Sequence, residues 1–252
     1  IEENQKTVDK INQLFEWLYK INDLSVKTVK NLIIESKWSK TEESVQEMVA
    51  FILQAIKTDD LLHSNLIELL IQLDSANSNE LRILLPFLKD KLLKTFDQER
   101  CNCEFVYRLY KKGLITKEEL FPKLKEFETK NYQNSKNLLY WFLPEIIELG
   151  CFDEQKYCKN WDSSIFSHYY PDKIDLYKKM RDSFEPDDEI TRALRIDDVD
   201  TFQSIISSKN IKNISVCFVP PNIFDSFNAN KISYLNYSAA LGSIKCFKYL
   251  LL

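Results

Sequence analysis

Apolar residues recur three or four positions apart along much of the chain. Such stripes predict amphipathic helices that each bury one face. Strand-like character is confined to a short β-branched and aromatic run, 214–219, directly before Pro220 and Pro221. The pattern therefore predicts an all-α fold. The two clearest stripes are Val8, Ile11, Leu14, Phe15 and Leu18, and Val45, Met48, Val49, Ile52, Leu53 and Ile56.

Short polar signals predict where helices begin. Ser39 with Glu42, and Thr116 with Glu119, have the S/T-x-x-E spacing of a capping box. Glycine is scarce, with only 3 among 252 residues. Because tight hairpins and phosphate-binding loops need glycine at positive φ, this scarcity again favours helices.

Two segments with a central glycine indicate an internal repeat. Residues 109–116 and 146–153 each read as a helix end, a glycine in the left-handed region, two apolar residues and an N-cap. The glycines, Gly113 and Gly150, lie 37 positions apart, and Asn22 holds the same place in a third, weaker copy. We expect solenoid-like helical hairpins of about 36 residues. The alternative is that any two antiparallel helices give this pattern.

Pro86 and Pro144 fall inside apolar helical windows. Pro86 and Pro122 stand in matching phase before the two glycines, which supports the hairpin interpretation. Pro86 and Pro144 are each expected either to occupy the first turn of a helix or to kink one.

Composition and charge exclude several classes of protein. Apolar residues make up 44% of the chain, enough for a buried core, and the formal net charge is −4 with no basic cluster, so nucleic-acid binding is not expected. The most apolar stretch, 66–73, is too short to span a membrane. The chain begins at Ile1 in charged sequence without a secretory signal, so we expect a segment of a longer protein.

Residues that could carry chemistry are few. The six cysteines form no CxxC pair and the only histidines are His63 and His168, so neither a metal site nor a cofactor is expected. The thiols are expected to stay reduced, which favours a cytoplasmic protein. An acidic cluster at 187–189 fits a helix N-terminus. No catalytic residues are assigned and the chain is predicted not to be an enzyme; the alternative is a site assembled from scattered residues, with His63 or His168 beside a cysteine.

The segment from Ser233 to Leu251 carries the most specific signal. It resembles the ankyrin repeat, whose pattern is T-P-L-H-x-A-A-x-x-G-H-x-x-V-V-x-x-L-L. Gly242 is expected to end a first helix, and Ser243 to cap a second. Tyr234 and Asn236 depart from the pattern. The positions that match outright are Leu235, Ala239, Gly242, Leu250 and Leu251.

A weaker copy lies upstream at a constant offset of 45 positions, whereas ankyrin repeats recur about every 33 residues. Asp197 replaces the glycine, so this copy is expected to be an atypical first or capping repeat with a less ideal turn. The matched residues are Ile190, Leu194, Asp197, Asp198, Phe202, Ile205 and Ile206.

The order of these segments is similar to that in the large ankyrin families of parasitic protists. We therefore expect an N-terminal helical-hairpin domain at 1–161, a connection at 162–186 and the start of an ankyrin array at 187–252, with repeats near 187–208 and 230–252. The resemblance implies a non-enzymatic scaffold that binds proteins; an alternative is a substrate adaptor of a ubiquitin-ligase type of complex. The residues it assigns to protein binding are Asn230, Lys231, Ala240 and Leu241.

The end of the chain gives a last expectation. In a solenoid each repeat buries an apolar face against the next one. We expect further repeats after Leu252, and without them an exposed apolar patch through which the chain associates with another molecule. The residues of this patch are Phe247, Leu250, Leu251 and Leu252.

Overall fold

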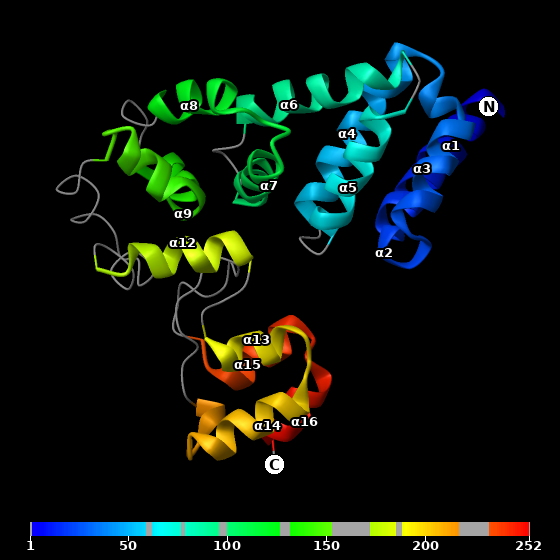
Figure 1. Ribbon diagram of the computed structural model, residues 1–252. Helices are drawn as coiled ribbons and strands as arrows, with labels where there is room; N and C mark the ends of the chain where they lie inside the picture. Colours follow the sequence, from blue (N-terminus) through cyan, green and yellow to red (C-terminus); the bar gives the residue numbers. More distant parts are fainter. Residues whose placement is uncertain are drawn as a thin grey trace. The chain divides into compact units, whose positions relative to one another are not determined.

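The computed structural model describes residues 2–58, 62–76, 79–95, 100–126, 132–152, 172–184, 188–216 and 232–251 (Figure 1). Every regular element in these ranges is a helix, which confirms the predicted all-α class. The chain divides into two compact units, Ile1–Cys151 and Phe152–Leu252. In the predicted connection, 162–186, the described residues 172–184 contain helix α12, and the remainder lies outside the described residues.

The helices of the first unit pack in two rows, and consecutive long helices belong to alternate rows. In one row α1 contacts α4, and α4 contacts α6. In the other row α3 contacts α5, α5 contacts α7, and α7 contacts α9. This is an arrangement of stacked helical repeats, as the hairpin pattern predicts. The elements are α1 (Glu2–Tyr19), α2 (Ile21–Leu24), α3 (Val26–Glu35), η1 (Lys37–Ser39), α4 (Glu42–Thr58), α5 (His63–Asp74), η3 (Leu81–Ile83), α6 (Leu84–Thr95), α7 (Arg100–Lys111), α8 (Lys117–Lys125) and α9 (Tyr132–Glu148).

The predicted stripes form the core of the first unit. In α1, Leu14 and Leu18 are fully buried, and Phe15 is half-buried with its ring 4.9 Å from that of Phe51. All members of the second stripe are buried along α4 except Leu53, which is half-buried. The burial follows the 3.6-residue period that the sequence displays.

One of the two predicted capping boxes is present. The Thr116 hydroxyl accepts a hydrogen bond from Glu119 N, while the Glu119 carboxylate accepts one from Thr116 N at 2.8 Å. The prediction for Ser39 is wrong, because its hydroxyl donates to the Ile34 carbonyl oxygen at 2.8 Å. Thr41 caps α4 instead and accepts from Ser44 N.

The two glycine turns take the predicted conformation. Gly113 and Gly150 have φ of 72° and 69°, and each follows a helix that closes with the paired hydrogen bonds of a Schellman motif. The third copy is wrong, because Asn22 lies within α2 and the positive φ falls on Ser25. The predicted left-handed turn therefore follows α7 and α9, but Asn22 does not form the corresponding turn after α1.

The prolines have different consequences. Pro86 is the third residue of α6, where its missing N–H has no intrahelical partner to lose. Pro144 lies inside α9, and Phe142 just before it has non-helical angles of −124° and 15°. Helix α9 is kinked at this point because the ring of Pro144 clashes with the preceding turn.

The second unit contains two helix pairs that pack on each other. Within the pairs α13 contacts α14 and α15 contacts α16; between them α13 contacts α15 and α14 contacts α16. Residues 214–216 form a 3-10 helix, so the strand signal at 214–219 is wrong over the part that the structure describes. The elements are α12 (Ile174–Ser183), α13 (Glu189–Arg195), α14 (Val199–Ser208), η5 (Ile214–Val216), α15 (Tyr234–Leu241) and α16 (Ile244–Leu251).

A single apolar cluster holds the four helices α13–α16 together. Leu194, Phe202, Tyr237 and Cys246 are fully buried in it. The ring of Phe202 meets that of Tyr249 edge-on at 5.8 Å between centroids. Since both helix pairs contribute to one core, neither pair is a separate folding unit.

Candidate protein-binding surface

The pairs α13–α14 and α15–α16 repeat each other at the predicted offset of 45. Helix α13 starts at Glu189 and α15 at Tyr234, while α14 starts at Val199 and α16 at Ile244. The residues before the first helices also correspond, because Asp188 accepts from Thr191 N and Ser233 accepts from Asn236 N. The sequence offset is therefore a structural register that includes the N-caps.

The turns inside the two hairpins correspond as well. Asp197 has φ 53° and Gly242 has φ 70°, and both turns have the hydrogen bonds of a Schellman motif. A non-glycine residue in this region is uncommon, although aspartate tolerates it better than most. The upstream copy therefore accommodates Asp197 at its turn, as expected.

Asp197 has a further role that its position alone does not reveal. Its carboxylate accepts hydrogen bonds from Lys245 N and Cys246 N, both 3.0 Å from Oδ1, at the start of α16. Burial opposes ionisation of Asp197, but these two N–H groups outweigh that effect and lower its pKa. Asp197 therefore caps a helix of the neighbouring hairpin.

Ser243 also donates a hydrogen bond from the second hairpin to the first. It is buried, and its hydroxyl donates to the Leu194 carbonyl oxygen, at the end of α13, with 2.5 Å between the oxygens. The prediction that Ser243 caps the second helix by its side chain is wrong, because Asp197 holds the N–H groups of that helix end. The two bonds join the hairpins at their turns.

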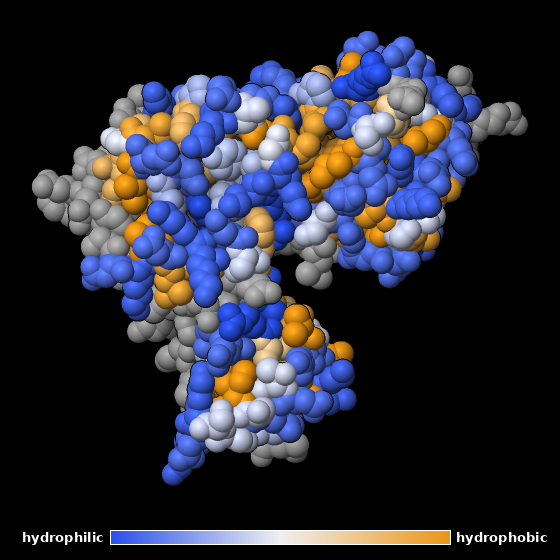
Figure 2. Space-filling model, viewed as in Figure 1, coloured by the Kyte–Doolittle hydropathy of each residue, from blue (hydrophilic) through white to orange (hydrophobic). Residues whose placement is uncertain are grey.

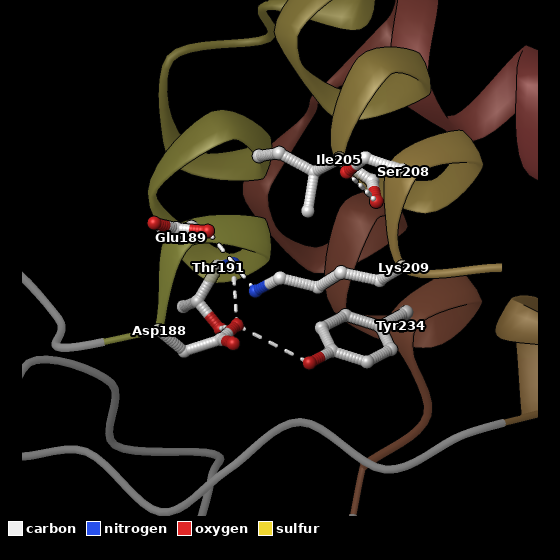
Figure 3. Close-up of polar contacts among 7 residues, drawn as sticks. All are labelled: Asp188, Glu189, Thr191, Ile205, Ser208, Lys209 and Tyr234. Atoms are coloured by element: carbon white, nitrogen blue, oxygen red, sulfur yellow. Dashed lines mark hydrogen bonds and ion pairs between the residues drawn. The ribbon is translucent and has the colours of Figure 1, made fainter. Parts of the chain in front are cut away.

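A second polar junction lies at the N-terminal ends of the first helices (Figure 3). One oxygen of Asp188 accepts from Thr191 N at 2.7 Å, from Thr191 Oγ1 at 2.6 Å and from Tyr234 Oη at 3.2 Å. Lys209 Nζ donates to Glu189 Oε2 at 3.0 Å, and this bond lowers the pKa of Glu189. Of the predicted acidic cluster, Asp188 and Glu189 lie at the N-terminus of α13 as predicted, and they also connect α13 to α14 and α15. Asp187 lies outside the described residues.

The four residues assigned to protein binding fall into two groups. Asn230 and Lys231 lie outside the described residues. Ala240 is exposed on α15, whereas Leu241 is half-buried and packs against the core of α13–α16. Of the described pair, Ala240 is the one whose side chain is exposed to solvent.

The residues expected to form an apolar patch at the chain end differ in exposure. Leu251 is 60% exposed and Phe247 is half-buried, but Leu250 is buried at 8% and belongs to the core. Ile244, which the sequence analysis left out, is 62% exposed. Leu252 lies outside the described residues. In the view of Figure 2 the hydrophobic areas on α13–α16 are separate and bordered by hydrophilic side chains.

A hollow of about 690 Å³ opens on the α13–α14 pair. Its lining mixes charged and apolar side chains, and Ile196 within it is 74% exposed. Such a mixture suits a peptide or a side chain of a partner better than a small apolar ligand. The lining residues are Phe184, Glu189, Arg192, Ala193, Arg195, Ile196, Thr201 and Ile205.

His63, one of the two histidines considered for catalysis, belongs to a buried polar cluster in the first unit. Its Nδ1 lies 3.4 Å from Glu104 Oε1, and Nε2 lies 2.9 Å from the Ile56 carbonyl oxygen. Arg108 Nη2 is 2.8 Å from the same Glu104 oxygen. Burial raises the pKa of Glu104, but His63 and Arg108 outweigh it and lower the pKa overall. With His63 fully buried, this cluster joins α4, α5 and α7 rather than facing a substrate.

The cysteine side chains that the structure describes are buried, which disfavours a nucleophilic role. Cys103, Cys151 and Cys246 carry thiols and are buried. Burial, followed by the negative charge of Asp197, raises the pKa of the Cys246 thiol to about 12. Because the thiolate is the reactive form, this thiol is unsuited to catalysis near neutral pH. His168 lies outside the described residues.

The described ranges hold neither a metal-binding cluster nor a helix able to span a membrane. No group of three or more His, Cys, Asp or Glu side chains there is placed to hold a metal ion. No helix in those ranges combines the length and the apolar character that crossing a membrane requires.

Comparisons of the chain with protein-family models, with curated proteins and with solved structures found no match.

Proposed function

We propose that this protein is a non-enzymatic scaffold that binds other proteins through stacked helical hairpins. The observation that carries the proposal is the common register of α13–α14 and α15–α16, which repeat each other at 45 positions. Hydrogen bonds donated by α15–α16 to α13–α14 join the two hairpins at their turns. Stacked repeats offer extended surfaces on which rim residues vary without disturbing the core. The buried state of His63 and Cys246 also favours binding over catalysis.

We further propose that these two hairpins begin an ankyrin array. Three features support this: a polar N-cap before each first helix, a left-handed residue at each turn, and apolar second helices that pack together. The spacing of 45, against about 33 in the family, places the extra residues in the segment between the hairpins. Most of that segment, 217–231, lies outside the described residues.

The partner is proposed to contact the rim formed by the first-helix face and the turn before it. Ala240, exposed on α15, is the described member of this rim, and Asn230 and Lys231 are its expected neighbours. A cytoplasmic location suits the buried thiols.

The test is affinity capture followed by mass spectrometry, with the natural chain and two variants. Ala240→Arg places a long charged side chain on the proposed rim. Ala50→Arg makes the same change at an exposed alanine of α4 in the first unit and is the matched control. We expect a reproducible protein partner that is lost with Ala240→Arg and retained with Ala50→Arg. Recovery of no reproducible partner, or a partner that both variants retain, contradicts the proposal.

A further inference from the structure

The hollow on α13–α14 marks a place where the two hairpins differ. In α15–α16 the side chains at the equivalent positions are aromatic or apolar, and they are buried in the core of α13–α16 or pack against it. In α13–α14 these positions line the hollow, and two of them are charged. Burying the charges under an apolar hairpin would be costly, so this side is not built for the packing that joins the two hairpins. The α13–α14 residues are Glu189, Arg192, Ile196, Thr201 and Ile205, and their equivalents in α15–α16 are Tyr234, Tyr237, Leu241, Cys246 and Leu250.

Positive charge predominates in the hollow. Its described lining has one carboxylate, that of Glu189, and two guanidinium groups, those of Arg192 and Arg195. Glu189 already has a cation beside it, because Lys209 Nζ lies 3.0 Å from its Oε2 (Figure 3). Each arginine has five N–H donors, so it can bind a carboxylate in addition to its contacts within the chain. The hollow therefore complements an acidic ligand.

Apolar side chains lie in the same lining as the two arginines. Ile196 follows Arg195 directly and is 74% exposed, while Phe184 and Ile205 are half-buried. The hollow is lined from three helices, because Phe184 is the C-cap of α12. Its volume of about 690 Å³ falls in the range of pockets that enclose ligands. A ligand that fills it gains both charge pairing and apolar contact.

We propose that this hollow binds a short acidic peptide segment of another protein, in which a large apolar side chain is flanked by carboxylates. The carboxylates pair with Arg192 and Arg195, which are three positions apart and so about 4.5 Å apart along α13. The planar guanidinium groups suit this role, since they bind carboxylates through two hydrogen bonds. The apolar side chain covers Ile196 and contacts Phe184 and Ile205. This site is additional to the rim at Ala240 and goes beyond the proposed function.

Two other occupants fit the hollow less well. A second copy of this chain that docked through α16 would bring Lys245 and Lys248, both exposed, toward the arginines, and the like charges would repel. A small inorganic anion would pair with the arginines but would leave Ile196 uncovered. An acidic peptide with an apolar side chain uses both parts of the lining.

The probe is the fluorescein-labelled peptide GEEIEEG, and its binding to the natural chain is measured by fluorescence anisotropy. Two comparison peptides change one feature each: GEEAEEG lacks the large apolar side chain, and GKKIKKG reverses the charge. We expect GEEIEEG to bind about tenfold more tightly than either, because each comparison peptide loses one of the two contributions. Its affinity should also fall as salt is added, since charge pairs at an open surface are screened.

A matched pair of double variants tests the charges. Arg192→Gln with Arg195→Gln removes two positive charges from the hollow. Lys245→Gln with Lys248→Gln removes two at the same spacing from exposed positions of α16 and is the control. We expect the affinity for GEEIEEG to fall about tenfold or more with the arginine variant and to change less than about twofold with the lysine variant.

A second matched pair tests the apolar contact and does not depend on the arginines. Ile196→Ser removes a side chain that is 74% exposed, so the fold should be kept. Ile244→Ser is the control, at 62% exposure on α16. We expect Ile196→Ser to weaken binding of GEEIEEG about threefold or more and Ile244→Ser to leave it within about twofold. If circular dichroism shows that the arginine variant has lost helix, this pair decides.

Three outcomes overturn the inference. The first is no detectable binding of GEEIEEG to the natural chain. The second is equal binding of GEEIEEG and GEEAEEG, which would make the hollow a site for anions alone. The third is an equal loss of affinity in Ile196→Ser and its control, which would place the peptide elsewhere. The capture experiment depends on Ala240 and on a natural partner, so either proposal can fail without the other.

Discussion

The hairpins α13–α14 and α15–α16 share a backbone register but solve the same turn in different ways. At the left-handed position the first hairpin has Asp197 and the second has Gly242. Glycine adopts this conformation without steric cost, whereas aspartate does so at some cost and gains two N–H donors from α16. The hairpin with the less regular turn, α13–α14, is therefore the one whose turn residue caps a helix of its neighbour.

This difference shows how a degenerate repeat can remain part of a stack. The backbone angles, the N-caps and the burial pattern are common to both hairpins, while the side chain at the turn depends on what lies beyond it. A departure from a repeat pattern then marks a contact between repeats rather than the loss of the repeat. The predictions below test this distinction with matched changes in the two hairpins.

The largest expected difference is between Phe202→Ala and Phe247→Ala. Phe202 is fully buried, so its truncation should destabilise α13–α16 by about 3–5 kcal/mol. Phe247 occupies the equivalent place in α16 and is half-buried, so we expect a loss of about 1 kcal/mol. Because the chain has two compact units, the losses are read from amide exchange of 199–208 and not from a whole-chain unfolding curve. Equal losses of stability in the two variants would show that Phe202 and Phe247 are not equivalent positions of one repeat.

Ser243→Ala should have an intermediate effect. The substitution removes the buried hydroxyl that donates to the Leu194 carbonyl oxygen, and we expect α13–α16 to lose about 1–2 kcal/mol. Its equivalent, Asp198, accepts from Thr201 N as the N-cap of α14, so Asp198→Ala is the comparison, with a loss of about 1 kcal/mol. The amides of α13 should report the Ser243 change more strongly than the Asp198 change. The reverse order would argue against the bond between hairpins.

Gly242→Ala isolates the backbone cost of the turn. Gly242 has φ 70° and no atom within 4 Å of the place a Cβ would take, so the substitution meets strain without a clash. We expect a loss of about 0.5–1 kcal/mol in the stability of α15–α16, and a smaller one for Gly242→Asn, since asparagine tolerates this conformation better. Amide exchange of 234–251 is the measurement. No loss with alanine would mean that the turn relaxes out of the left-handed region.

Acid should weaken the junction between the hairpins. The folded pKa of Asp197 is lowered, so its contribution is present above the unfolded value near 3.9 and disappears as the pH falls through the folded pKa. We expect exchange at the start of α16, corrected for its intrinsic pH dependence, to be unchanged from pH 7 to about pH 5 and to accelerate below about pH 4. Asp197→Asn should remove this acid dependence. An acid-induced loss that persists in the asparagine variant must come from other carboxylates.

The sequence predicts local features well because they depend on residues close along the chain. The stripe in α4, the capping box at Thr116, and the turns at Gly113, Gly150 and Gly242 all follow from spacings of a few positions. The offset of 45 is also readable, because it needs only two copies of the same pattern. Errors occur where neighbouring residues compete, as when Thr41 rather than Ser39 caps α4.

Contacts between hairpins were not predicted, for a physical reason. Asp197 and Cys246 are far apart in sequence, and only the packing of α14 on α16 brings them together. The pattern gives Ser243 a capping role because it cannot show that a carboxylate from another hairpin already holds the helix end. The exposure of Ile244 was missed in the same way, since it depends on which face of α16 the first hairpin covers.

The most direct test of the stacked-repeat account is amide exchange of Lys245 and Cys246, resolved by nuclear magnetic resonance. Amides in the first turn of a helix have no intrahelical acceptor and normally exchange fast. If the hairpins stack through Asp197, both amides are protected in the natural chain, and Asp197→Ala reduces this protection about tenfold while the fold is kept. Fast exchange of both amides in the natural chain, or protection that survives Asp197→Ala, would contradict this stacking.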